Sequence, residues 1–246
     1  MLFADNVILV EGIAEKLLMP LFMDKCGIPY EDENISIVEI GGKHFEHFVE
    51  LFNGNHVKKR VLCITDKDFK WIVDGVLQSK SDYDSYAVPH IEKLKERFNI
   101  ENFAVFTQEC GGRTFEDELF ITNMSDDSVA DVLFDMSVCD SLKAFSKAYK
   151  FNISDWITNI DILDGRTKTA VKPYLDAYNQ RIDTKEELTN FYEKLVFSEL
   201  FLHYAENSKG DLALQILTNE KLYGEDKKTK ITVPKYIQEG LEWLTK

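Results

Sequence analysis

The sequence contains 246 residues, a length that suits one large domain or a domain that carries an insertion. It has 29 Lys and Arg residues against 43 Asp and Glu residues, which gives a formal net charge of −14. Its hydrophobic share of 44% is typical of a globular chain and excludes a disordered one. The acidity argues against a free-standing, non-specific nucleic-acid binder, which needs a basic surface to neutralise phosphates. It leaves open a site in which metal ions supply the positive charge.

The cysteines and the apolar segments indicate in which cellular compartment to expect the protein. The four cysteines are far apart in the sequence, so there is no CxxC motif of the kind that binds zinc or acts in redox chemistry. Isolated cysteines are typical of proteins in a reducing compartment, and we therefore expect a cytoplasmic protein. No apolar run approaches the roughly 20 residues that a membrane-spanning helix needs, so no membrane partner is expected.

Taken in chain order, the first third of the sequence alternates predicted strands with predicted helices. Short apolar runs at 7–10, 35–40 and 60–65 predict strands that are buried on both faces. The segments between them, 14–26 and 44–52, carry apolar residues on one helical face. This alternation indicates an α/β fold, in which helices flank a parallel sheet with right-handed crossovers.

The pattern loosens after the third strand. We predict a loop over 70–85, a helix over 89–98, a fourth strand at 103–106 and a helix from about 115. The segment 124–205 is mostly helical in pattern. The tail predicts a helix at 212–217, a charged loop at 225–230 and a last helix from 234. We therefore expect a core in 1–123, a helical insertion or subdomain in 124–205, and a return to the core region in 206–246.

Acidic residues gather where the predicted strands end. Glu11 ends the first strand, Glu15 follows it by one helical turn, and Asp66 and Asp68 follow the third strand. The carboxyl ends of parallel strands meet at one edge of an open sheet, where ligands bind. Carboxylates brought together there resist joint ionisation unless a cation joins them. All-oxygen ligands suit Mg²⁺, Mn²⁺ or Ca²⁺ rather than zinc.

Each of these acidic residues also has a purely structural interpretation. Glu15 could complement the N-terminus of a helix, and the Asp66-Lys67-Asp68 segment could be an ordinary turn. Glu11 is harder to explain in that way, because a carboxylate that ends a run of four aliphatic residues is costly unless it has a partner. The set as a whole therefore favours a metal site.

Two of these segments resemble the Toprim domain, the metal-binding domain shared by topoisomerases, primases and certain nucleases. They are Val10-Glu11-Gly12-Ile13-Ala14-Glu15 and Ile64-Thr65-Asp66-Lys67-Asp68. Further segments resemble the Toprim half of the OLD (overcoming lysogenization defect) family nucleases: Val38-Glu39-Ile40-Gly41-Gly42-Lys43, Thr114-Phe115-Glu116-Asp117-Glu118-Leu119, Ser208-Lys209-Gly210-Asp211-Leu212-Ala213 and Val233-Pro234-Lys235-Tyr236-Ile237. The resemblance implies a Toprim (Rossmann-like) parallel sheet with a mostly helical insertion.

The resemblance also implies roles for individual residues. Divalent metal ions, two of them Mg²⁺ or Mn²⁺ with Ca²⁺ as a further candidate, would be held by Glu11, Glu15, Asp66, Asp68 and Glu116. Glu11 and Asp66 would take part in catalysis, with Gly12 and Thr114 in support. Lys209 would stabilise the transition state, although without the resemblance it looks like a surface lysine. Thr114 and Asp117 also match a helix capping box.

The implied partners are a DNA substrate and an ATPase. Members of the family carry an N-terminal ABC-type ATPase that drives dimerisation, and this sequence has no GxxxxGK[ST] motif. The ATPase could belong to a longer protein of which this chain is the C-terminal part, or be a separate chain, or the domain could act alone. The resemblance favours a nuclease that works with an ATPase domain or subunit, in anti-phage defence or DNA processing. A homo-oligomer would be in keeping with it.

Two other classes of function remain open. A non-catalytic Toprim module could bind partners or nucleic acid within a larger complex, although every acidic position of the motif is occupied. A phosphohydrolase of the haloacid dehalogenase type would also use a DxD motif. Against it, Phe69 rather than threonine follows Asp68, and the motif ends the third strand instead of the first.

Overall fold

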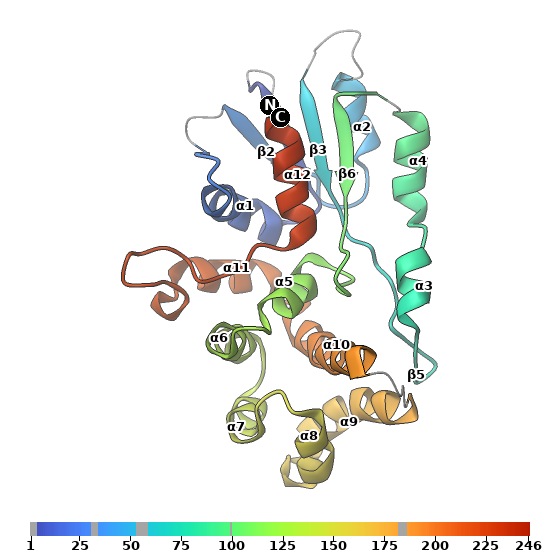
Figure 1. The fold of residues 1–246 in the computed structure, drawn as a ribbon, viewed down its shortest axis with the longest axis vertical. Coiled ribbons are helices and arrows are strands. Elements are labelled where there is room, and N and C mark those ends of the chain that lie inside the picture. Colours follow the sequence, from blue (N-terminus) through green and yellow to red (C-terminus); the bar gives the residue numbers. More distant parts are fainter. Residues whose placement is uncertain (1–3, 31–33, 53–58, 99, 182–185) are drawn as a thin grey trace.

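The structure is a computed structural model that describes residues 4–30, 34–52, 59–98, 100–181 and 186–246. Its centre is a four-stranded parallel sheet in the order β2-β1-β3-β6 (Figure 1). The strands are β1 (Asn6–Val10), β2 (Ile35–Glu39), β3 (Arg60–Ile64) and β6 (Phe103–Phe106). The predicted α/β class, with helices around a parallel sheet, is confirmed.

Alternate residues of the inner strands are buried on opposite faces of the sheet, which explains their continuous apolar sequence. Ile8 and Val10 belong to a core that includes α1 (Ile13–Lys25) and α12 (Lys235–Thr245). Val7 and Leu9 belong to a second core with the opposite helices. These are α2 (Glu46–Val49), the 3₁₀ turn Glu50–Phe52 and α4 (Pro89–Arg97).

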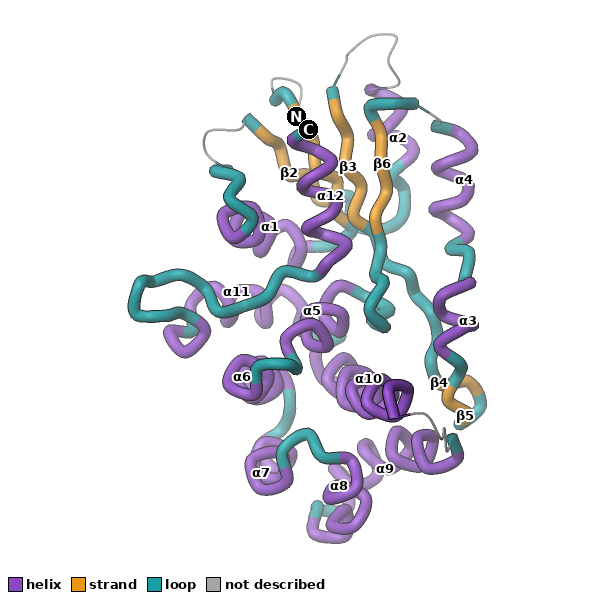
Figure 2. The backbone as a smooth tube through the Cα atoms, in the orientation of Figure 1, coloured by secondary structure: helices purple, strands orange, loops and turns teal. Residues whose placement is uncertain are grey.

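A layer of helices lies beyond the carboxyl ends of the strands (Figure 2). Its helices are α5 (Phe115–Asn123), α6 (Asp127–Ser137), α7 (Asp140–Tyr149), α8 (Ile153–Asn159), α9 (Gly165–Gln180), α10 (Glu186–Ala205) and α11 (Lys209–Thr218), with 3₁₀ turns at Ile160–Ile162 and Glu220–Leu222. The helical layer and one face of the sheet share a single hydrophobic core. The boundaries expected at 123 and 205 remain a prediction.

The predicted loop over 70–85 is wrong. It contains a hairpin of β4 (Ile72–Val73) and β5 (Val76–Leu77), followed by α3 (Lys80–Ser85). Asp74 and Gly75 turn the hairpin with positive φ angles of 51° and 79°, the geometry that an Asp-Gly pair favours. Ser79 and Asp82 form a capping box at the start of α3. The strands are only two residues long, too short to show an alternating pattern.

The remaining predicted elements differ mainly in their ends. The helix expected over 44–52 is a four-residue α2 followed by a 3₁₀ turn, and α11 begins at Lys209 rather than near 212. Cys63 is completely buried within β3. In the part of the chain that the structure describes, no helix combines the length and apolar character that crossing a bilayer requires.

Candidate functional site

Glu11 lies directly after β1, at the carboxyl edge of the sheet. Its Oε2 accepts a hydrogen bond from the Thr65 hydroxyl at 3.0 Å and one from the Asp66 backbone N–H at 3.2 Å. The Thr65 oxygen also lies 2.9 Å from His90 Nε2. Because the Thr65 proton points to Glu11, His90 must donate through Nε2. Burial, and then the charge of Lys43, lower the pKa of His90, which favours its neutral form.

Glu15 and Asp66 are buried beside this edge. Burial, followed by the charge of Glu116, raises the pKa of Glu15 to about 7. Burial and the neighbouring Glu15 and Glu116 raise the pKa of Asp66 well above its usual range. Gln108, also buried, donates from Nε2 to Asp66 Oδ1 at 2.9 Å. Carboxylates are thus held close enough to oppose one another's ionisation.

Gly12 gives Glu15 room within this group. A methyl group added at Gly12 would lie 3.1 Å from Glu15 Oε2. Gly12 also occupies the N-cap position of α1, with an extended backbone. The supporting role predicted for Gly12 therefore has a steric basis in the packing of Glu15.

Glu116 enters the site from the first turn of α5. It is buried, and Thr114 Oγ1 donates to its Oε2 at 2.9 Å. Lys209 Nζ lies 2.8 Å from the same oxygen. Burial alone would lower the pKa of Lys209, but Glu116, Asp66 and Glu15 outweigh it and the net shift is upward. Lys209 is therefore an ammonium ion that faces the buried carboxylates.

Asp68 stands apart from the buried carboxylates. Its side chain is 42% exposed and forms an ion pair with Lys43. Its φ of 54° lies in the left-handed region, which Asp tolerates better than most residues. Its backbone N–H donates to Arg113 O at 2.8 Å. The structure thus places Asp68 on the solvent side of the site.

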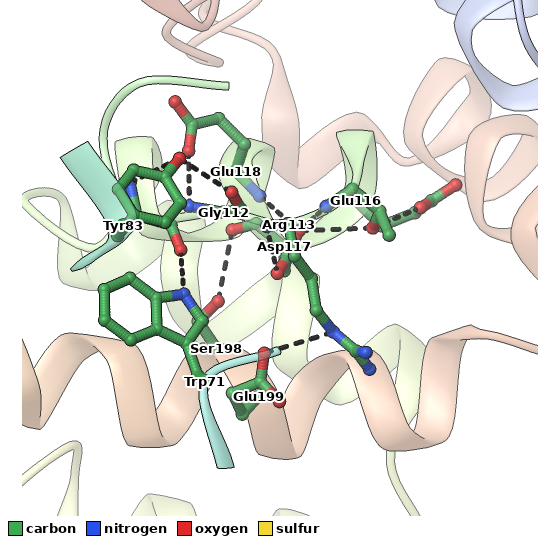
Figure 3. Close-up of polar contacts among 11 residues, drawn as sticks. Trp71, Tyr83, Gly112, Arg113, Glu116, Asp117, Glu118, Ser198 and Glu199 are labelled. Carbon is green, nitrogen blue, oxygen red and sulfur yellow. Dashed lines mark hydrogen bonds and ion pairs between the residues drawn. The ribbon is translucent and has the colours of Figure 1, made fainter. Parts of the chain in front are cut away.

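The loop that leads to Glu116 is fastened by buried side chains (Figure 3). Glu118 accepts hydrogen bonds from the backbone N–H groups of Glu109, Cys110 and Gly112. Asp117 accepts from the N–H groups of Arg113 and Thr114, so the predicted capping box is present. From the other side, Trp71 and Tyr83 donate to the carbonyls of Gly111 and Gly112. These contacts hold Thr114 and Glu116 in place.

The candidate metal ligands at this site have the chemistry that a hard divalent cation prefers. They are carboxylate oxygens, and Glu116 Oε1 is buried without a hydrogen-bond partner among the described residues. A buried acceptor left unpaired is costly, and a bound cation would satisfy it. The geometry is not that of a preformed cage, because no three His, Cys, Asp or Glu side chains of the described ranges are arranged to hold one ion. Lys209 instead faces Glu116.

Most of the predicted site residues are therefore neighbours. Glu11, Glu15, Asp66, Glu116 and Lys209 interact electrostatically, whereas Asp68 pairs elsewhere. The sequence did not point to three further residues, Thr65, His90 and Gln108. Thr65 lies inside a motif already singled out, and Gln108 follows the predicted strand at 103–106 by two residues, as Asp66 follows β3. Nothing in the sequence marks His90, which acts through a contact across the fold.

Part of the chain matches a known protein family. Residues 2–68 match the family model of the TOPRIM domain of overcoming lysogenization defect protein-like proteins, a range that includes Glu11, Glu15, Asp66 and Asp68. The chain is 36% identical over 72 residues to endonuclease GajA of Bacillus cereus (strain VD045). That match covers 28% of this chain and only 12% of the length of that relative.

Two solved structures share the overall fold. One is the C-terminal region of the Xanthomonas campestris pv. campestris OLD protein, with 20% identity, a TM-score of 0.50 and coverage of 98% of this chain and 92% of that one. The other is the C-terminal region of the Burkholderia pseudomallei OLD protein, with 19% identity, a TM-score of 0.51 and coverage of 99% and 98%. The resemblance seen in the motifs is confirmed: residues 2–68 match the OLD-like TOPRIM domain, and the chain has the fold of the C-terminal region of OLD proteins.

Proposed function

We propose that this chain is the nuclease centre of an OLD-like system and hydrolyses DNA phosphodiester bonds with the help of divalent metal ions. The observation that carries the proposal is the group of buried carboxylates with raised pKa values around Asp66 and Glu15, faced by one ammonium group. A purely structural core has little reason to hold such a group, whereas sites of phosphoryl chemistry do.

The metal ions would be held by Glu11, Glu15, Asp66 and Glu116, with Asp68 at the solvent side. Bound Mg²⁺ or Mn²⁺, in a two-ion arrangement, would supply Lewis acidity toward the phosphate and its attacking water. The chain's own groups have separate tasks. Lys209 would neutralise charge that develops on the phosphate. Thr65 and Gln108 would orient Glu11 and Asp66 by the hydrogen bonds they donate.

The wider setting is also part of the proposal. The chain matches a small part of the length of GajA, and the OLD structures that share its fold are C-terminal regions. We therefore infer that the nuclease centre works with an ATPase domain or subunit and with DNA as substrate, in anti-phage defence or DNA processing.

The test is metal binding and plasmid cleavage by wild type and Asp66→Asn. Wild type should bind Mn²⁺ in calorimetric titration and nick or cut supercoiled plasmid in Mg²⁺ or Mn²⁺, and EDTA should stop the reaction. Asp66→Asn should weaken Mn²⁺ binding and lower cleavage by at least about 100-fold. Asp176→Asn is the matched control, because Asp176 is an exposed aspartate that pairs with Lys172 on α9.

Unaltered Mn²⁺ binding and cleavage in Asp66→Asn would contradict the site assignment. A wild-type chain that binds Mn²⁺ and DNA but does not cut in the presence of ATP and its ATPase partner would favour the non-catalytic Toprim module instead.

A further inference from the structure

A small basic hollow opens beside the acidic site. Its volume is about 240 Å³, and it is lined by Lys43, Glu46, His90, Lys93, Leu94 and Arg97. Three of these six residues are cations and one is a carboxylate, in a chain whose net charge is −14. The hollow is therefore a local reversal of the charge of the molecule.

The local folding explains why these cations meet. On α4, Ile91 and Leu94 are buried, and Leu94 belongs to the core on one face of the sheet. Lys93 and Arg97 are exposed four residues apart, on one side of the helix. The cations on α4 thus stand beside the apolar floor that Leu94 provides.

Lys43 reaches the hollow from the other side. It follows Gly41 and Gly42, whose φ angles of 71° and 137° lie where glycine is favoured. The turn that these glycines make, directly after β2, places a cation opposite α4 at the carboxyl edge of the sheet.

Two contacts join the hollow to the acidic site. Lys43 forms an ion pair with Asp68, which follows β3. His90 hydrogen-bonds to Thr65, which in turn donates to Glu11. A strand whose scissile phosphate lies at Glu11 would therefore have a neighbouring phosphate within reach of this hollow.

The two cations that α4 contributes to the hollow are available to an anion. Lys93 has no ion-pair partner among the residues that the structure describes. Arg97 pairs with Glu50 at 2.7 Å, but both side chains are about half exposed, at 51% and 52%. Exposed pairs of this kind contribute only about 0–1 kcal/mol, so a phosphate can compete with Glu50.

We propose that this hollow binds a backbone phosphate of the DNA strand that is cleaved, namely the phosphate next to the scissile one. The proposal rests on the proposed nuclease function. The volume is below the roughly 300 Å³ typical of sites for drug-sized molecules, so the hollow suits a phosphate group and not a whole nucleotide. Contacts to phosphate carry no base information, and the hollow positions the strand without selecting its sequence.

The test is the affinity for a fluorescently labelled short DNA duplex, measured by anisotropy in Mg²⁺ over a range of salt concentrations. Every protein carries Asp66→Asn so that the duplex stays intact. The pocket variant is Lys93→Ala with Arg97→Ala. The control is Lys95→Ala, which removes an exposed lysine of the same helix that does not line the hollow. Thermal unfolding followed by circular dichroism checks that each variant is folded.

The pocket variant should bind the duplex at least about 10-fold more weakly than its parent, and the magnitude of its salt slope should fall by roughly 1, the value for one lost phosphate contact. Lys95→Ala should match the parent. Inorganic phosphate at the concentration of DNA phosphate should not displace the duplex, because the hollow takes one phosphate of a continuous strand.

Equal affinity and equal salt slope in the pocket variant and the parent would overturn the proposal, as would a parent that does not bind the duplex at all. Displacement by dilute inorganic phosphate would mean that the hollow is a site for the free anion. If binding depends on the hollow while the chain with Asp66 intact never cuts, only the nuclease function fails. If cutting depends on Asp66 while the pocket variant binds normally, only the hollow is misassigned.

Discussion

Glu15 shows at the scale of one residue how a carboxylate of the proposed site lowers the stability of the folded protein. Its carboxyl is buried, with Glu116 and Glu11 nearby, and its pKa is raised to about 7 from the usual value of 4.5. A raised carboxyl pKa means that ionising the carboxyl costs more free energy in the folded state than in the unfolded state. The folded protein therefore loses stability as the pH rises from about 4.5 to about 7.

We predict that Glu15→Gln stabilises the protein at pH 8 in EDTA, because the amide keeps the shape of the side chain and has no charge to bury. The gain in the free energy of unfolding should be about 1–3 kcal/mol. It should shrink at pH 5, where Glu15 is protonated in the folded wild type. Urea unfolding at the two pH values measures both quantities.

The control is Asp24→Asn, which neutralises an exposed carboxylate on the same helix and should show no such gain. Saturating Mg²⁺ should reduce the advantage of Glu15→Gln, since a cation bound to the wild-type carboxylates stabilises the folded state. A variant that is less stable than wild type at pH 8 in EDTA would show that Glu15 contributes a favourable interaction instead.

The sequence identified the acidic site residues at the ends of strands, but not the polar residues that hydrogen-bond to them or to their neighbours. Glu11 and Asp66 could be predicted because the carboxyl ends of parallel strands meet at one edge. Gln108 follows β6 at the same edge, but a neutral amide does not signal a metal site in the way that a carboxylate does. His90 could not be predicted, because it reaches Thr65 from α4 and follows no recognisable pattern. For Asp68, the sequence cannot show that a left-handed backbone turns it toward Lys43.

At the scale of elements, the strands were predictable and the short elements were not. The strands of the sheet are runs of apolar residues, and each was predicted to within about a residue at its ends. The hairpin of β4 and β5 was missed even though Asp74-Gly75 and the Ser79 capping box were readable as turn and helix signals. Its stability comes from packing of Trp71, Leu77 and Tyr83 against α9 and α10, which local sequence does not reveal.

The loop before α5 yields a prediction about close packing. A methyl group added at Gly112 would lie 2.5 to 2.6 Å from the Cβ, Cα and N atoms of Glu118, so backbone would have to move. Gly112→Ala should therefore lower the free energy of unfolding by about 1–3 kcal/mol. It should also lower cleavage, because the loop and α5 together carry Thr114 and Glu116. Urea unfolding and plasmid cleavage measure the two effects.

Gly165→Ala is the matched control for this prediction. Gly165 begins α9 with no atom within 4 Å of the added methyl, and alanine favours the helix there. It should leave cleavage unchanged and stability equal or slightly higher. Wild-type stability in Gly112→Ala would show that the loop can move away from α5 without cost.

At the scale of the whole molecule, charged side chains of both signs lie together at one edge of the sheet, whereas the hydrophobic core joins the sheet to the helical layer. The acidity is spread over the chain, yet the buried carboxylates and the basic hollow lie next to each other at the carboxyl edge of the sheet, joined by the Lys43–Asp68 and His90–Thr65 contacts. The sequence suggested a helical insertion or subdomain at 124–205. In the structure, Ile8 of β1 and Trp156 of α8 belong to the same continuous core, and this continuity predicts cooperative unfolding.

Phe120 offers the sharpest test of this cooperativity. It is completely buried on α5, stacks on Phe201 of α10 with ring centroids 4.5 Å apart, and contacts the rings of Phe134 and Phe151. Phe120→Ala should lower the free energy of unfolding by about 3–5 kcal/mol, because it removes a large apolar side chain and leaves a cavity. If the core unites the two layers, the loss should appear in one transition for the entire molecule.

Two probes can separate one transition from two. Far-UV circular dichroism in urea follows the helices. The fluorine NMR signal of 5-fluorotryptophan at Trp243, on the helix beside the sheet, follows the other layer without replacing the buried Trp71 and Trp156. Both midpoints should fall together in Phe120→Ala, while Ile162→Ala, at a side chain that is 67% exposed, should shift neither. A helical transition that falls while the Trp243 signal stays at its original midpoint would show that the helical layer unfolds separately, and that the shared core does not couple it to the site.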